Sequence, residues 1–160
     1  MTPETSRPPL PEPAFREVDG TDYELLETVR VPDERHACVL TIPAGRVTDF
    51  ASSPRAAWLL FDRLDGGTLP PAVHDELYRH GGVVDVAPAR AYTRAEADRL
   101  FYDLMLRQGV APWRARLAYL GVRVGGASAW RASASFGTPL GTPFGTPLGT
   151  PALSPAEDPR

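Results

Sequence analysis

Four side chains in this sequence have the types and spacing needed to activate a water molecule. His74, Asp75 and Tyr78 lie within one predicted helix, and Asp98 lies within the next. His74 and Tyr78 are four residues apart and share a helical face, whereas Asp75 is turned about 100° away. A hydrogen bond between His74 and Asp98 would fix the imidazole tautomer and leave the other ring nitrogen free to take a proton from water. We expect Tyr78 to steady the Asp98 carboxylate.

The two helices must run antiparallel to bring these side chains together. Leu77 lies next to the His74 face and can pack on Ala97 of the second helix, which places Asp98 within reach of His74. Residues 81–92 are numerous enough for the chain to turn back between the helices. The sequence therefore predicts an antiparallel helix pair that carries the candidate site.

Start and stop signals bound three helices. The first runs from Pro70 to about His80, because proline fits a first helical turn and two glycines follow. The second begins with a capping box at residues 93–96 and ends at Gly109. Its residues at helical spacing should face the core: Ala97, Leu100, Phe101, Leu104 and Met105. A third begins near Pro112, and we expect it to carry four large residues inward: Trp113, Leu117, Leu120 and Val124.

Strand-like segments precede these helices. Residues 23–31 and 36–42 are rich in strand formers, and residues 32–34 between them favour a turn, so we expect a β-hairpin. A short strand near residues 46–48 and a short helix at residues 56–61 complete the expected elements. The fold class is α+β: a small antiparallel β-hairpin or sheet followed by about three α-helices, two of them the antiparallel pair with the site.

The two ends of the chain are low in core-forming residues. Residues 1–13 contain five prolines and should form a disordered arm. A Gly-Thr-Pro-Leu or Gly-Thr-Pro-Phe repeat begins at residue 137, and we expect a disordered tail over residues 133–160. That tail could dock on a partner or be a simple-sequence expansion. A single domain over residues 14–132 remains.

Composition excludes several classes of function. The net charge is −3, and acidic and basic residues are mixed along the chain, so we expect no nucleic-acid partner. All seventeen basic residues are arginine, which excludes lysine Schiff-base chemistry and a P-loop lysine. The lone Cys38 cannot form an internal disulfide. No signal-peptide pattern and no run of about 20 apolar residues occurs, so we expect a cytoplasmic protein without a transmembrane segment.

The His-Asp motif resembles that of secreted and parvoviral phospholipases A2. These enzymes carry His-Asp-x-x-Tyr on one helix and a later Ala/Cys-Asp on an antiparallel helix, which here are residues 74–78 and 97–98. The resemblance implies that His74 is the general base, that Asp75 binds calcium, and that Asp98 and Tyr78 orient the histidine. Leu77 and Ala97 stand where the secreted enzymes place a disulfide.

The resemblance does not extend to the calcium loop. Those enzymes complete the calcium shell with carbonyls of a glycine-rich loop about twenty residues before the histidine, whereas residues 53–58 here contain no glycine. Calcium takes six to eight oxygen ligands, so Asp75 alone is insufficient. The remaining ligands would have to come from Asp49, Ser52, the Gly66-Gly67 backbone or water.

Three motifs also resemble a phage- and prophage-associated domain family of unknown function. They are Val-Thr-Asp-Phe-Ala-Ser-Ser-Pro-Arg at 47–55, His-Asp-Glu-Leu-Tyr-Arg at 74–79 and Ala-Asp-Arg-Leu-Phe at 97–101. This resemblance implies a phage context, in the host cytoplasm or the virion. Asp49 in the first motif could supply a ligand or a hydrogen bond beside His74, or could cap a turn through its own backbone.

Three functional hypotheses follow from these patterns. The leading one is a calcium-assisted, phospholipase A2-like hydrolase of a lipid-type ester. The alternative is a non-catalytic virion or tail-assembly protein, in which the His-Asp-Tyr cluster braces the helices. A weaker third is a peptidoglycan- or sugar-directed hydrolase that uses paired carboxylates such as Asp49 and Asp75.

Overall fold

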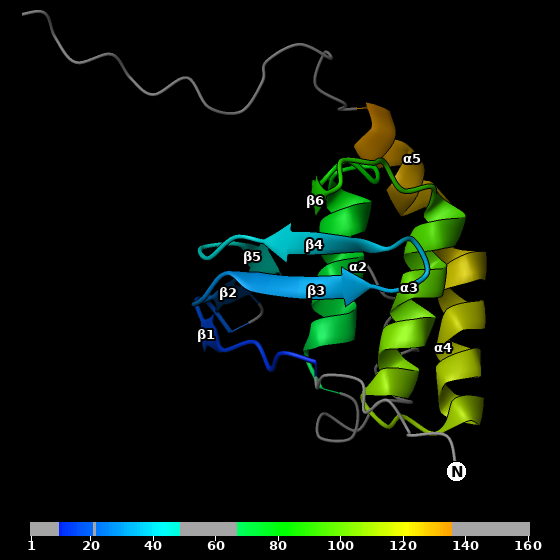
Figure 1. Ribbon diagram of the computed structural model, residues 1–160, viewed down its shortest axis with the longest axis horizontal. Helices are drawn as coiled ribbons and strands as arrows, with labels where there is room; N and C mark the ends of the chain where they lie inside the picture. Colours follow the sequence, from blue (N-terminus) through cyan, green and yellow to red (C-terminus); the bar gives the residue numbers. More distant parts are fainter. Residues whose placement is uncertain (1–9, 21, 49–66, 136–160) are drawn as a thin grey trace, which may run out of the picture.

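Two small sheets and a layer of helices make up the structure, a computed structural model that describes residues 10–20, 22–48 and 67–135. One antiparallel sheet has the order β1-β2-β5 and the other β3-β4-β6. The strands are β1 (Phe15–Glu17), β2 (Tyr23–Leu25), β3 (Val29–Asp33), β4 (Cys38–Ile42), β5 (Val47–Thr48) and β6 (Asp85–Ala87). The helices are α2 (Leu69–Arg79), α3 (Arg94–Arg107), α4 (Pro112–Gly125) and α5 (Ala127–Ser135), and Figure 1 shows them beside the strands. The predicted α+β class is confirmed.

β2 and β3 divide the segment 23–31, which the sequence pattern predicts as one strand. β2 pairs with β1 and β5, whereas β3 pairs with β4 in the other sheet. The break falls at residues 26–28, which are exposed, while Leu25 and Val29 on either side are buried. The single-strand prediction was wrong because no glycine or proline marks this break.

The hairpin of β3 and β4 confirms the predicted pairing but not the predicted turn. The turn occupies residues 34–37 rather than 32–34. Asp33 is the last residue of β3, and its Oδ1 accepts hydrogen bonds from the backbone N–H groups of Arg35 (3.1 Å) and His36 (3.3 Å). This aspartate therefore starts the turn from the end of the strand.

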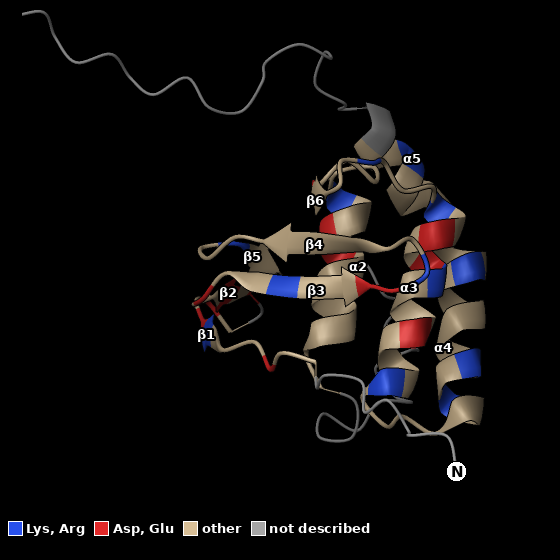
Figure 2. Ribbon diagram, in the orientation of Figure 1, with Lys and Arg blue, Asp and Glu red and all other residues tan. Residues whose placement is uncertain are grey.

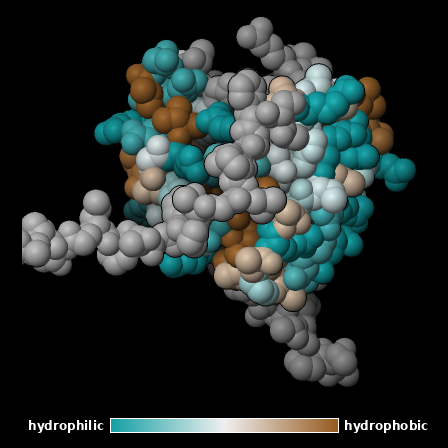
Figure 3. Space-filling view, turned by 90° about the horizontal axis from the view of Figure 1, so that it is seen from above, coloured by the Kyte–Doolittle hydropathy of each residue, from teal (hydrophilic) through white to brown (hydrophobic). Residues whose placement is uncertain are grey.

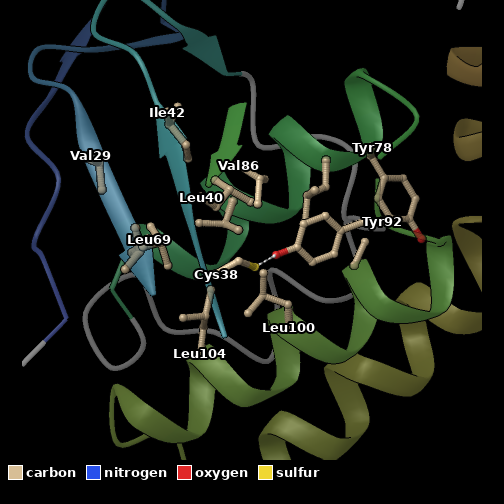
Figure 4. Packing of buried hydrophobic residues seen from close by; sticks show 14 of the residues in the cluster. Val29, Cys38, Leu40, Ile42, Leu69, Tyr78, Val86, Tyr92, Leu100 and Leu104 are labelled. Carbon is tan, nitrogen blue, oxygen red and sulfur yellow. Dashed lines mark hydrogen bonds between the residues drawn. The ribbon is translucent and has the colours of Figure 1, made fainter. Parts of the chain in front are cut away.

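α2 lies at the centre of the fold. Nine of its eleven residues are buried, which is typical of a helix covered on several sides. Strands lie on one side of it and α3 on the other (Figure 1). Figure 4 shows side chains from the strands and from α2 and α3 meeting in one core, with these among them: Val29, Leu40, Ile42, Leu69, Val86, Leu100 and Leu104. Each fully buried leucine or valine contributes about 1.5–3 kcal/mol to that core.

α2 and α3 form the predicted antiparallel pair. The end of α2 meets the start of α3, since the N–H of Tyr92 donates to the carbonyl of Gly82 (2.9 Å). Gly82 has a φ of +83°, and a Cβ there would collide with the Tyr92 carbonyl. At the other end of the pair, Gly67 lies against the side chain of Gln108. The connection between the helices thus requires glycine at residue 82.

α3 begins as the sequence predicts. The Thr93 hydroxyl accepts from the N–H of Glu96, and the Glu96 carboxylate accepts from the N–H of Thr93. The hydrogen bond from the Thr93 backbone lowers the pKa of Glu96 and burial raises it. The lowering dominates, with help from the Thr93 and Arg90 side chains, and the pKa is about 2. The five residues predicted to face the core are all buried: Ala97, Leu100, Phe101, Leu104 and Met105.

α4 begins at the predicted proline, but the face of the helix that is buried is opposite to the predicted one. Its small residues Ala115, Ala118 and Val122 are buried and pack with Phe101 and Met105 of α3. The four large residues predicted to face inward are exposed instead: Trp113, Leu117, Leu120 and Val124. The prediction was wrong because α3 supplies the bulk at this contact, which leaves room for small side chains from α4.

Several predictions lie outside the described residues. They include the helix at 56–61 and most of the terminal arm and tail, at 1–9 and 136–160. The short strand predicted near residues 46–48 is confirmed as β5. Within the part of the chain that the structure describes, none of the helices is both long and apolar enough to cross a membrane.

Candidate functional site

His74, Tyr78 and Asp98 form one hydrogen-bonded unit between α2 and α3. Nε2 of His74 lies 2.9 Å from Oδ1 of Asp98, and the Tyr78 hydroxyl donates to the same oxygen at 2.6 Å. His74 and Tyr78 are stacked along α2 with their ring centroids 4.1 Å apart. Asp98 follows Ala97, which is buried in the same core as Leu77. The structure thus brings together the three residues that the helical spacing predicts to meet.

Asp98 is fully buried and is held at both carboxylate oxygens. Its Oδ2 accepts a hydrogen bond from Nη1 of Arg123 on α4 at 2.9 Å and lies 3.7 Å from Nη1 of Arg94. Burial raises the pKa of Asp98, but hydrogen bonds from His74, Tyr78 and Arg123 outweigh it, so the pKa lies below its usual range. Burial and then the Asp98 hydrogen bond raise the pKa of Tyr78. Asp98 is therefore an anion and Tyr78 a neutral donor.

The His74 ring is enclosed, and one of its two nitrogens has no hydrogen-bond partner in the described part of the chain. It lies between the rings of Tyr78 and Phe101, with the Phe101 centroid 4.9 Å away, and its side chain has no exposed surface. Because Nε2 faces the anionic Asp98, Nε2 carries the proton in the neutral ring. Nδ1 is then an acceptor, and it has no hydrogen-bond partner among the residues that the structure describes. Buried polar atoms in this state are uncommon in proteins and call for an explanation.

Asp75 points to a different neighbour. Its Oδ2 accepts a hydrogen bond from the Thr48 hydroxyl of β5 at 2.5 Å, and its side chain is buried. Asp75 and Thr48 line a small pocket between α2 and the β1-β2-β5 sheet, together with Arg46 and Arg79. The cavity has a volume of about 20 Å³, which is room for about one water molecule and far below the volume of a typical ligand site. His74 does not line this pocket.

Glu76 is the third buried ionisable residue in a row on α2. Its Oε1 lies 3.1 Å from Nε of Arg46 and 3.4 Å from Nε2 of His80. Successive helical residues point about 100° apart, so His74, Asp75 and Glu76 reach partners on three sides of α2. Each of these three buried ionisable side chains thus has a polar neighbour.

The predicted metal site is not assembled by the described residues. Asp49 lies outside them, and within ranges 10–20, 22–48 and 67–135 no group of three His, Cys, Asp or Glu side chains is placed to hold a metal ion. Asp75 shares its pocket with two arginines, which is a poor environment for a cation. The calcium assignment stays a prediction.

Sequence reasoning missed three contributors to the site. Arg123 lies on α4, 25 residues after Asp98, and no spacing rule connects the two. Thr48 belongs to the first motif, in which the sequence pattern indicates Asp49 and not the neighbouring Thr48 as the functional residue. Gly126 lies against Tyr78, since a Cβ at residue 126 would collide with the Tyr78 hydroxyl. The sequence signal for this residue is the double glycine at the end of α4.

A second histidine cluster lies elsewhere in the fold. Nδ1 of His36 is 2.7 Å from Oδ2 of Asp33, and the Tyr92 hydroxyl donates to the same oxygen at 2.9 Å. The Tyr92 hydroxyl also lies 3.3 Å from the Cys38 sulfur, and a dashed line marks this contact in Figure 4. Unlike Nδ1 of His74, the second nitrogen of His36 has an acidic neighbour, Glu96, at 3.3 Å.

The fold and the site define a small α+β domain with a buried His-Asp-Tyr unit between two antiparallel helices. Residues 23–122 match the family described as "Protein of unknown function (DUF1353)", and the chain belongs to this family. The matched range contains His74, Tyr78 and Asp98 and stops one residue before Arg123. No curated protein and no solved structure matches the chain.

Proposed function

We propose that this domain hydrolyses an ester, with His74 as the general base that activates the attacking water. One observation carries the proposal: Asp98 holds Nε2 of His74, while the buried Nδ1 has no hydrogen-bond partner in the described part of the chain. A neutral imidazole held in this tautomer has its basic lone pair on Nδ1. The resemblance of the motif to phospholipases A2 makes a lipid-type ester the substrate class.

The proposed reaction has two steps, and in each step one proton moves to or from Nδ1 of His74. A water molecule transfers a proton to Nδ1 as its oxygen attacks the ester carbonyl. The C–O bond of the tetrahedral intermediate then breaks, and the leaving alkoxide takes the proton back from Nδ1. The anionic Asp98 stabilises the imidazolium between the two steps, because its lowered pKa keeps it ionised. Tyr78 and Arg123 hold Asp98 in place throughout.

Burial of His74 sets a requirement on this mechanism. Its side chain has no exposed surface, and the pocket at Asp75 does not include it. Substrate and water must therefore reach Nδ1 through a local opening around the ring. Lids and loops that open around buried active sites are common in enzymes.

Calcium enters the proposal through Asp75. When bound, calcium would polarise the ester carbonyl. The other oxygen ligands would have to come from Asp49, Ser52, the backbone or water, because the described residues do not complete the shell.

The experiment is a hydrolysis assay with matched histidine variants. The full chain would be tested on phospholipid vesicles and on short-chain esters, with and without calcium. His74→Gln should abolish turnover, whereas His36→Gln, which alters the second His-Asp-Tyr cluster, should retain it. Loss of activity in both variants to the same degree, or no activity in the wild-type protein, would count against the proposal.

A second candidate function is a non-catalytic component of a phage virion or tail. The observation that favours it is the complete enclosure of Asp98, which His74, Tyr78 and Arg123 hydrogen-bond from two different helices. Networks of this kind fix helix register without chemistry. On this view no ester is hydrolysed, and His74→Gln lowers stability while the protein still assembles with its partner.

A further inference from the structure

Asp98 faces two arginines through the carboxylate oxygen that His74 does not contact. This Oδ2 lies 2.9 Å from Nη1 of Arg123, in the last turn of α4, and 3.7 Å from Nη1 of Arg94, the first residue of α3. The Asp98 side chain has no exposed surface, whereas the Arg123 side chain is 32% exposed and the Arg94 side chain 23%. The two guanidinium groups therefore form a partly exposed layer beside the buried His-Asp-Tyr unit.

One carboxylate does not balance the two guanidinium charges. In the described part of the chain, Asp98 is the one acidic side chain within ion-pair distance of Arg94 or Arg123. The neighbouring helices add positive charge, since α4 and α5 together contain four arginines and no acidic residue, and Figure 2 shows blue but no red along α4. A charge that is partly removed from water interacts more strongly than one in bulk water. This excess of positive charge therefore favours an anionic ligand.

Both arginines have hydrogen-bond donors left for such a ligand. Nη1 of Arg123 donates to Asp98, and Nη1 of Arg94 donates to the backbone carbonyls of residues 122 and 123. Within the described ranges, neither arginine has a hydrogen-bond partner at Nε or Nη2. The planar fork of N–H groups on a guanidinium matches the oxygens of phosphates and carboxylates.

The two arginines belong to helix ends that lie together. The start of α3 and the end of α4 are both at the upper end of the molecule in Figure 1, and Figure 3 looks onto that end. The surface on the α3 and α4 side of this view is largely hydrophilic. Gly125 ends α4 and is exposed, and Gly126 follows it, so neither of these residues has a side chain that could cover Arg123.

We propose that Arg94 and Arg123 bind a phosphodiester group of the substrate. Nε and Nη2 of the two arginines donate to the phosphate oxygens, while Nη1 of Arg123 stays on Asp98. The single negative charge of a phosphodiester completes the balance of two guanidinium groups and one carboxylate. Its oxygens are arranged tetrahedrally and can accept from two helices, whereas the two oxygens of a carboxylate lie in one plane and suit one fork.

This inference rests on the proposed hydrolysis and narrows its substrate class. Asp98 contacts Arg123 through Oδ2 and His74 through Oδ1, so the phosphodiester site is one carboxylate away from the general base. The substrate is then an ester that also carries a phosphodiester, and the phosphodiester belongs either to a lipid headgroup or to a soluble molecule.

Arginine NMR of the full chain tests the phosphodiester site without relying on catalysis. The Nε–H signals would be followed while dimethyl phosphate is added at constant ionic strength, and assigned by their loss in Arg94→Lys and Arg99→Lys, which keep the charge. Arg99 is the matched control, because it pairs with Asp103 four residues later on α3, as Arg94 pairs with Asp98. The Arg94 signal should shift and saturate, and the Arg99 signal should not. No saturating shift at Arg94, or equal shifts at both arginines, would overturn the proposal.

Kinetics test whether the bound phosphodiester belongs to the substrate. Arg94→Gln should raise the KM for a short-chain phosphatidylcholine about tenfold, the loss expected for one charge-assisted hydrogen bond. The preference for this lipid over the neutral diacylglycerol with the same chains should fall by the same factor, whereas Arg99→Gln should keep it. An equal loss on both esters would indicate a structural role and overturn the proposal.

Two further comparisons separate the possible outcomes. Glycerophosphocholine, a soluble phosphodiester, should inhibit hydrolysis if the site takes soluble molecules, whereas inhibition only by non-hydrolysable lipid analogues would identify a lipid headgroup. A saturating Arg94 shift in a protein that hydrolyses no ester would support phosphodiester binding and count against the hydrolysis alone. Hydrolysis without this shift would count against the phosphodiester site alone.

Discussion

Oδ1 of Asp98 lies 2.9 Å from Nε2 of His74, and this contact joins α3 to α2 at the point where both side chains are fully buried. Nothing else in the described structure gives His74 a fixed tautomer. The same contact serves both proposed functions, because it can orient a general base or brace two helices. The predictions below separate these roles.

Replacing Asp98 should destabilise the fold. Asp98→Asn keeps the volume but removes the charge that His74, Tyr78 and Arg123 share, and leaves buried donors poorly paired. We expect a loss on the order of 1–3 kcal/mol in the free energy of unfolding, measured by denaturant titration. Asp103→Asn is the matched control on α3, since Asp103 pairs with Arg35 near the surface and should cost under about 1 kcal/mol. Equal effects of the two substitutions would contradict the bracing role.

Stability should fall as the solution becomes acidic. Glu96 has its pKa lowered from 4.5 to about 2, with the Thr93 backbone hydrogen bond as the largest cause, and the pKa of Asp98 is also lowered. A carboxylate whose pKa is depressed in the folded state stabilises the fold above its unfolded pKa and loses this contribution as the pH falls through the folded value. The free energy of unfolding should therefore decrease from pH 5 to pH 2. Glu96→Gln should flatten this decrease, and an unchanged slope would contradict the assigned capping role.

Gly126 should be intolerant of a side chain. Gly126→Ala places a Cβ against the Tyr78 hydroxyl and the Val122 carbonyl, so Tyr78 must move away from Asp98. The control is Gly121→Ala on α4, where the added Cβ meets nothing within 4 Å and alanine should stabilise the helix by about 0.5–1 kcal/mol. Thermal unfolding at low protein concentration should move in opposite directions for the two variants. A neutral Gly126→Ala would show that Tyr78 does not depend on this close approach.

Calcium binding should depend on Asp75. Isothermal titration of the full chain with calcium should give heat that Asp75→Asn removes, if the resemblance to phospholipases A2 extends to the metal. Glu76→Gln is the neighbouring control, because Glu76 also lines the pocket but pairs with Arg46. Absence of calcium binding by the wild-type protein would remove the metal from the proposal and leave His74 as a metal-independent base.

The parts of the fold that short-range rules govern could be predicted from the sequence. The capping box at Thr93 and the prolines in the first turn of α2 act within one helical turn, so both helix starts follow from neighbouring residues. The meeting of His74 with Asp98 also followed, since a four-residue spacing and one apolar contact determine it. Local signals were enough wherever the partner was on the same or the next helix.

Features set by the packing of distant elements could not be predicted. The rotation of α4 about its axis depends on the bulk of Phe101 and Met105 on α3. Because α4 has apolar residues on two faces, the sequence pattern alone predicted the wrong face to be buried. Arg123 reaches Asp98 only because of that rotation. The switch from β2 to β3 likewise follows from which sheet each end joins, and residues 26–28 carry no breaker to indicate it.

The tautomer of His74 tests the central claim most directly. Nitrogen NMR of the full chain, with the His74 signals assigned by their loss in His74→Gln, distinguishes a protonated ring nitrogen from an unprotonated one at neutral pH. A general base held by Asp98 requires a protonated Nε2 and an unprotonated Nδ1. A His74 ring protonated at Nδ1 and bare at Nε2 would contradict the account.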